Sequence, residues 1–215
     1  MKKDKNIILD NFIWRFAERC GAQLVTAVVT LLLARILMPE DYGRTALVAV
    51  FINILQVFID SGLGTALIQK KDADDLDFSS VFYFNFAVCL VLYAGMFIAA
   101  PYIVAFYKDP SLAPVVRVAS LTLVFSGVKG IQQAYVSRNM LFKRFFFATL
   151  GGTLFSAFLG LGMAYAGFGV WALVAQQLSN TAIDTLILWL TVHWRPKAVF
   201  SWQRLKGLLS YGWRL

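Results

Sequence analysis

The sequence predicts an all-α, polytopic membrane protein with six transmembrane helices and the amphipathic start of a seventh. Hydrophobic residues make up 59% of the 215 residues and charged residues only 15%, whereas soluble domains are about 25% charged. Six mostly apolar stretches are as long as the roughly 20 residues that a helix needs to cross a bilayer. This composition excludes a disordered or nucleic-acid-binding chain and argues against a soluble enzyme.

The six spans follow from the points where the apolar stretches are interrupted. The first ends before Pro39, because a residue that precedes proline avoids the α conformation, and Asp41 is expected to cap the next helix. The long charge-free stretch Phe145–Ile183 exceeds one crossing and is divided at Ala166-Gly167-Phe168-Gly169. The predicted spans cover about residues 12–37, 42–68, 78–107, 114–135, 146–165 and 170–192, and they form one lobe over residues 1–192.

Residues 193–215 are predicted to be a cytoplasmic amphipathic segment that leads into a truncated seventh span. Leu205, Leu208, Leu209 and Trp213 recur at helical spacing in this segment. The alternative is a helix that lies on the surface at the end of the chain.

The distribution of basic residues predicts the orientation. If the N-terminus is inside, most of the 20 Lys and Arg residues fall in inner segments. Cytoplasmic loops of membrane proteins carry such an excess. Both termini are therefore expected in the cytoplasm, and the net charge of +8 reflects these loops rather than binding to nucleic acid.

Polar side chains recur three or four residues apart within the predicted spans, so each set lies on one face of its helix. Because a charged side chain costs about 2.5–3.5 kcal/mol at the centre of a spanning helix, we expect the sets to converge on a cavity that opens inward. For any single residue the alternative is a membrane-interface anchor or a hydrogen bond between helices. The candidate substrate-binding residues are Arg15, Arg19, Asn53, Gln56, Asp60, Asn85, Lys129, Gln133, Gln176, Asn180 and Asp184.

Other motifs point to packing rather than to chemistry. Gly152, Ser156, Gly160 and Ala164 recur every four residues, which lets a neighbouring helix approach closely. Residues 72–77 are rich in Asp but lack the glycine and glutamate positions of an EF-hand loop; their acids are expected to cap the third span near Asp77. No metal site, cofactor site or catalytic constellation is predicted.

Two segments are similar to the bacterial polysaccharide (oligosaccharide) flippases. The first is Leu33-Ala34-Arg35-Ile36-Leu37-Met38-Pro39-Glu40-Asp41-Tyr42-Gly43, and the second is Asp60-Ser61-Gly62-Leu63-Gly64-Thr65-Ala66-Leu67-Ile68-Gln69. Weaker likenesses lie at residues 79–85 and 167–173. These proteins form the polysaccharide-transporter branch of the multidrug/oligosaccharidyl-lipid/polysaccharide exporter superfamily. From the residues alone, the glycines of the second segment loosen or end its helix.

The resemblance implies the N-terminal lobe of a two-lobe exporter fold in the bacterial inner (cytoplasmic) membrane. The implied activity is flipping of an undecaprenyl-pyrophosphate-linked oligosaccharide for polysaccharide or lipopolysaccharide biosynthesis, by alternating access. The implied partners are membrane lipids and either a missing C-terminal lobe or a second copy.

On this interpretation Arg15, Arg19 and Lys129 attract the pyrophosphate, and the Asn and Gln side chains solvate the sugar. Asp60 and Asp184 are candidates for coupling to protons or sodium. Two alternatives stay open: an ion-coupled small-molecule (drug) exporter of the same superfamily, and a pairing module that transports nothing.

Overall fold

The computed structural model describes residues 2–59, 62–70 and 72–212, and within them the side chains of residues 13–210. In these ranges the chain forms helices joined by short connections and contains no strand, so the predicted all-α fold class is confirmed. The helices are, in chain order, α1 (Lys2–Ile36), α2 (Pro39–Ile59), α3 (Leu63–Gln69), α4 (Asp75–Tyr107), α5 (Leu112–Ala119), α6 (Leu121–Arg138), α7 (Phe142–Tyr165), α8 (Val170–Thr191) and α9 (Trp202–Gly212).

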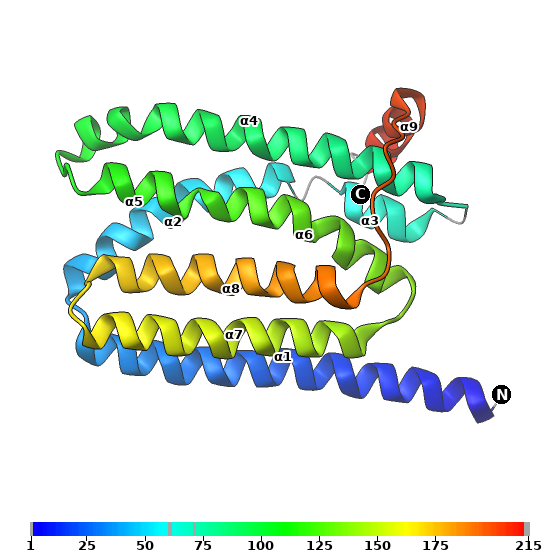
Figure 1. Cartoon of the computed structure of the whole chain (residues 1–215), viewed down its shortest axis with the longest axis horizontal. Helices are drawn as coiled ribbons and strands as arrows, with labels where there is room; N and C mark the ends of the chain where they lie inside the picture. Colours follow the sequence, from blue (N-terminus) through cyan, green and yellow to red (C-terminus); the bar gives the residue numbers. More distant parts are fainter. Residues whose placement is uncertain (1, 60–61, 71, 213–215) are drawn as a thin grey trace.

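The long helices lie side by side and alternate in direction (Figure 1). Helices α1, α4 and α7 run one way, and α2, the pair α5–α6, and α8 return. The beginning of α1 and the short helix α9 therefore lie at the same end of the bundle, which we call the termini end. Helix α7 lies between α1 and α8, while α6 packs against α3, α4 and α8.

Five segments of the described chain are long and apolar enough to cross a membrane, which makes the chain a multi-pass membrane protein. They correspond to the first five predicted spans and cover Ile13–Ile36, Pro39–Gln69, Asp75–Tyr107, Leu112–Arg138 and Phe142–Tyr165. The sixth predicted span is α8. It is long enough but less apolar, because it carries Gln176, Gln177, Asn180 and Asp184. Its crossing of the membrane stays a prediction.

Two of these segments consist of two helices each. Helix α2 ends at Ile59, and α3 follows Gly62, whose φ of 75° lies in the left-handed region that favours glycine. The glycine motif therefore ends a helix, as the sequence indicated. The break between α5 and α6 at Ser120 was not predicted. There the Ser120 hydroxyl donates to the Val116 carbonyl at 2.6 Å, a type of bond that often bends helices.

The first motif differs from expectation in one detail. Pro39 is the first residue of α2, where its missing N–H costs nothing, and Asp41 lies in the first turn instead of before it. The Asp41 carboxylate lies beside Gly169, which precedes α8: a Cβ on Gly169 would be 3.1 Å from Asp41 Oδ1. Two sequence segments that carry the family resemblance therefore meet at the end opposite the termini.

The ridge of small residues on α7 packs against α8, as predicted. A Cβ added to Gly152 would lie 3.0 Å from the Asn180 carbonyl oxygen, and one added to Gly160 would lie 2.9 Å from Gln176 Cβ. Only glycine lets the two backbones come this close. The ridge thus sets the position of the polar residues on α8.

Helix α9 and the segment that precedes it are attached to the beginning of α4 through polar contacts. Lys197 N–H donates to Ser79 Oγ at 3.0 Å and Ser201 N–H donates to Ser80 Oγ at 2.9 Å. Arg204 pairs with Asp74 at 2.6 Å. The apolar side of α9, with Leu205 and Leu208, is buried in the core at the same end.

The acidic turn before α4 caps that helix. Asp74 accepts from the Asp77 N–H at 3.0 Å, and Asp77 Oδ2 accepts from the Asp74 N–H at 3.2 Å. This reciprocal capping box satisfies two backbone donors and confirms the expected capping role of these acids. The hydrogen bond from the Asp77 N–H, followed by the Arg204 guanidinium, lowers the pKa of Asp74, and the Asp74 side chain raises the pKa of Arg204.

Candidate functional site

An ion pair joins α6 to α8 inside the bundle. Lys129 Nζ lies 2.9 Å from Asp184 Oδ2, and Asp184 is 5% exposed. Asp184 Oδ1 is buried without a hydrogen-bond partner. These residues come from two different predicted polar sets, 55 positions apart in the chain. The structure therefore brings these two sets together, as the converging-cavity hypothesis requires.

The polar row on α8 continues from this ion pair into a cleft between α1, α7 and α8. Asn180 and Gln176 follow Asp184 at intervals of four residues and line a cavity of about 210 Å³, together with Gln177. Facing them are the hydroxyl groups of Thr26 and Thr30 on α1 and of Thr153 and Ser156 on α7. The cleft offers amides and hydroxyls but no charge.

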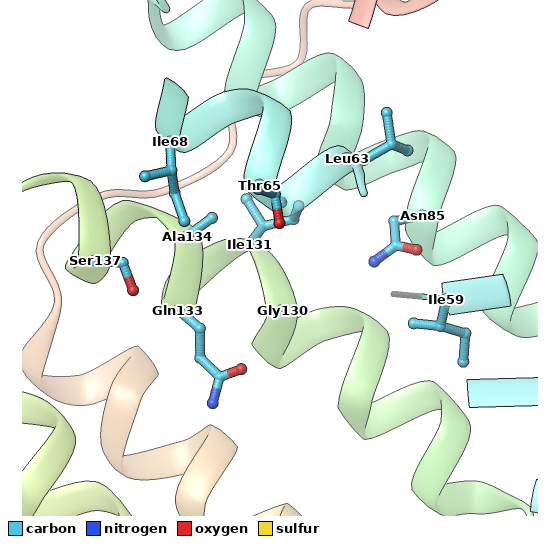
Figure 2. A pocket seen from close by; sticks show the side chains of 11 residues that line it. Ile59, Leu63, Thr65, Ile68, Asn85, Gly130, Ile131, Gln133, Ala134 and Ser137 are labelled. Atoms are coloured by element: carbon cyan, nitrogen blue, oxygen red, sulfur yellow. The ribbon is translucent and has the colours of Figure 1, made fainter. Parts of the chain in front are cut away.

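A second pocket, of about 280 Å³, lies between α3, α4 and α6 toward the termini end. Figure 2 shows the Asn85 amide and the Thr65 hydroxyl directed into this space from α4 and α3. Gln133 lies on its α6 wall, one helical turn beyond Lys129. Leu63 and Gly64, from the glycine motif, line the same pocket.

The ion pair, the α8 row and Gln133 form a continuous set that we call the polar wall. Its members are Gln133, Lys129, Asp184, Asn180 and Gln176, and each lies one turn from the next along α6 or α8 or is joined by the ion pair. The wall connects the α3–α6 pocket with the α1–α7–α8 cleft. It presents neutral donors and acceptors around a pair of charges that cancel each other.

Asn85 has a structural contact in addition to its place at the pocket. Its side-chain amide donates to the Gly127 carbonyl on α6 at 3.4 Å. A Cβ at Gly127 would overlap Cys89 Sγ, and a Cβ at Gly130 would lie 3.8 Å from Asn85 Nδ2. Glycines on α6 therefore let α4 approach and present Asn85 to the pocket.

The other predicted site residues lie outside the polar wall. Arg15 pairs with Glu18 at 2.8 Å, and its guanidinium lies over the rings of Phe142 and Phe145. Arg19 is exposed on α1. Asn53 is exposed and Gln56 half-buried on α2. Asp60 lies outside the described residues.

Sequence reasoning missed the hydroxyl groups that complete the cleft. Thr26, Thr30 and Thr153 are common in membrane helices and gave no distinct periodic signal. The every-fourth-residue ridge on α7 did include Ser156, but as a packing residue. The informative signal was the ridge itself, because a close α7–α8 contact places the α7 hydroxyls opposite the α8 amides.

In the part of the chain that the structure describes, no three His, Cys, Asp or Glu side chains lie close enough to hold a metal ion. The site can therefore be described by hydrogen bonding and charge: a ligand rich in hydroxyl groups would find complementary partners along the wall.

Comparison with known proteins decides the family. The model of the family described as polysaccharide biosynthesis protein matches residues 32–215. The chain belongs to this family. The chain is 26% identical to the succinoglycan biosynthesis transport protein ExoT of Rhizobium meliloti (strain 1021) over 94% of its own length, and 29% identical to the teichuronic acid biosynthesis protein TuaB of Bacillus subtilis (strain 168) over 73%. It is 25% identical to the lipopolysaccharide biosynthesis protein WzxC of Escherichia coli (strain K12) over 72%.

These alignments cover only part of each relative: 41% of ExoT, 33% of TuaB and 32% of WzxC. The chain therefore spans between about a third and two fifths of the length of the curated relatives it matches. No solved structure matches the chain significantly. The predicted family is confirmed, and at least one relative is named as a transport protein rather than an enzyme.

Proposed function

We propose that this chain is one lobe of a transporter that flips a lipid-linked oligosaccharide across the bacterial inner membrane for polysaccharide biosynthesis. The three relatives are named for the biosynthesis of succinoglycan, teichuronic acid and lipopolysaccharide. The lobe would supply binding and conformational change, with no catalytic step.

The polar wall is the observation that supports this proposal. A sugar presents many hydroxyl groups that both donate and accept hydrogen bonds, and the amides of Gln133, Asn180 and Gln176 can do the same. An apolar bundle that moved only lipid tails would have no use for this surface, because each buried polar group without a partner costs free energy. The polyprenyl tail of the substrate would stay in the bilayer.

We propose that the termini end is cytoplasmic, because the loops at that end contain most of the Lys and Arg residues. The α3–α6 pocket then lies toward the cytoplasm, the side from which the substrate would enter. Half-buried Arg15, exposed Arg19 and half-buried Lys129 are the cations of the predicted set that a pyrophosphate would contact. Lys129 would exchange Asp184 for the phosphate oxygens as the lobe moves.

A second lobe, in the same polypeptide or in a second copy, would complete the cavity. The chain supplies one side of it: Asn180 and Gln176 line a cleft with α1 and α7, and Asp184 contacts α6 through Lys129. Rocking of two lobes about such a shared polar surface is the alternating-access scheme of transporters built from repeats.

The test is photoaffinity labelling in lipid vesicles. The probe is an undecaprenyl-pyrophosphate oligosaccharide with a photoreactive group on the sugar, added to vesicles that contain the protein. We expect label in α6 and α8, and a decrease of about tenfold or more in the double variant Gln176→Leu and Asn180→Leu, since two hydrogen-bonding groups are lost. Gln203→Leu on α9 is the matched control, because this amide is exposed and distant from the wall.

Two results would refute the proposal. If organic cations competed with the probe while excess unlabelled oligosaccharide lipid did not, the drug-exporter alternative would take its place. If the label spread evenly over the helices and was unaffected by the double variant, the polar wall would have no part in substrate binding.

A further inference from the structure

A separate basic pocket lies at the termini end, and it shares no lining residue with the polar wall. It has a volume of about 630 Å³ and lies between the start of α1, the start of α7 and the end of α8. Its polar lining consists of Lys143, Arg144, Thr191 and His193, and none of its described lining residues is acidic. No step of the proposed transport uses this pocket.

The cations of the pocket are positioned by the fold. Arg144 Nη1 donates to the Thr191 carbonyl at 2.5 Å, which fixes the guanidinium at the end of α8 and uses one of its five N–H donors. Lys143 Nζ lies 5.5 Å from the centre of the Trp14 ring. Lys143 and His193 are exposed. Lys143, Arg144 and His193 therefore line one opening.

The rim of the pocket is apolar and faces outward. Phe147 is 52% exposed and Leu190 is 74% exposed. From Phe147 an exposed apolar stripe continues along α7 through Leu154, Phe155 and Phe158. In a multi-pass membrane protein such a stripe contacts lipid acyl chains, and it begins where the cations lie. A tryptophan next to the cations is typical of the membrane–water interface.

We propose that this pocket binds the headgroup of an anionic phospholipid, with one acyl chain lying along the α7 stripe. Lys143, Arg144 and His193 would contact the phosphodiester, and Trp14 and Phe147 would pack on the glycerol and the first methylene groups. Basic pockets between membrane helices bind anionic headgroups in this way. A free phosphate ion would use the cations alone and gain nothing from the aromatic rim.

The test is lipid retention measured by mass spectrometry. The full chain is reconstituted in vesicles of phosphatidylcholine with a minor fraction of phosphatidylglycerol, extracted in neutral detergent, and analysed for lipid that stays bound. We expect enrichment of phosphatidylglycerol on the unmodified protein and about fivefold weaker retention in Lys143→Gln, the effect of one cation near an anionic surface. His193→Gln should reduce retention less, because the glutamine amide still donates hydrogen bonds to the phosphodiester.

Lys206→Gln on α9 is the matched control, because it removes the same charge at the same end of the bundle but outside the pocket. Equal loss in both lysine variants would overturn the proposal in favour of general attraction between charges. Displacement of the lipid by inorganic phosphate would overturn it in favour of an ion site. Preferential displacement by undecaprenyl pyrophosphate would also overturn it and assign the pocket to the carrier lipid.

Discussion

The ion pair between Lys129 and Asp184 gives the sharpest prediction, because its two partners are buried to different degrees. The side chain of Asp184 is 7% exposed and that of Lys129 is 21% exposed. At 2.9 Å the attraction between unit charges is about 6 kcal/mol at an effective dielectric constant of about 20. Desolvation opposes most of this, so the cost of breaking the pair depends on which charge is left behind.

We expect Lys129→Met to destabilise the protein more than Asp184→Asn does. The methionine variant leaves a buried carboxylate without its cation, which typically costs about 3–5 kcal/mol. For a chain of this length that corresponds to a decrease in Tm of roughly 10 °C. The asparagine variant leaves a lysine whose flexible stem can carry the ammonium group toward water, so its cost should be about half as large. The double variant Lys129→Met and Asp184→Leu should recover most of the loss.

The assay follows the reactivity of the buried thiol of Cys89 during heating, in a Cys20→Ser background. Cys89 is 0% exposed and Cys20 is exposed, so only unfolding makes the remaining thiol accessible to a fluorescent reagent. Arg44→Met is the control, since the Arg44–Asp109 pair at the opposite end is partly exposed and should contribute no more than about 1 kcal/mol. Equal decreases in Tm in the two single variants would refute the interpretation that Asp184 depends on Lys129 for its charge. Additive decreases in Tm in the double variant would also refute it.

Three further predictions concern packing and the attachment of α9. Gly160→Ala should destabilise by about 1–3 kcal/mol because its methyl group meets α8, whereas Gly162→Ala, with open space around it, should be neutral or stabilising; thermal unfolding separates the two. Arg204→Gln should increase protease cleavage in α9, and Lys206→Gln should not, because only the arginine pairs with the acids before α4; no difference between them would contradict this. Since the folded-state pKa of Asp74 is lowered, its contribution to the attachment of α9 is present above pH about 4 and is lost as the pH falls below it; the protection of α9 amides, corrected for the pH dependence of intrinsic exchange, should decrease there, and Asp74→Asn should remove this dependence.

The sequence was sufficient to predict that the helices exist, because their length and lack of charge are local properties. It was less informative about where a span breaks. Gly62 signals the break before α3 through its conformational freedom, whereas the break at Ser120 coincides with a hydroxyl that bonds to the Val116 carbonyl one turn earlier. Many serines in helices make such bonds without ending the helix, so no local signal marks this one.

Prediction of the site from polar residues is limited in the same way, because their spacing is a local property. Spacing correctly groups Lys129 with Gln133, and Asn180 with Asp184, on single helix faces. Spacing does not say which neighbour each face meets. Asn53 illustrates this, because it follows the same rule and yet lies exposed on α2 beside exposed Ile54 and Val57. Only the packing of whole helices distinguishes a residue of the wall from one on the outer face.

The glycine ridge determines where the α8 part of the polar wall lies. Because Gly152 and Gly160 bring α7 against α8, Asn180 and Gln176 line one cleft together with Thr153 and Ser156 of α7. A larger residue on the ridge would separate the two helices and change the shape of this cleft. The ridge and the wall are therefore one structural device, and a change to either should alter both the stability of the lobe and the surface that it offers to a sugar.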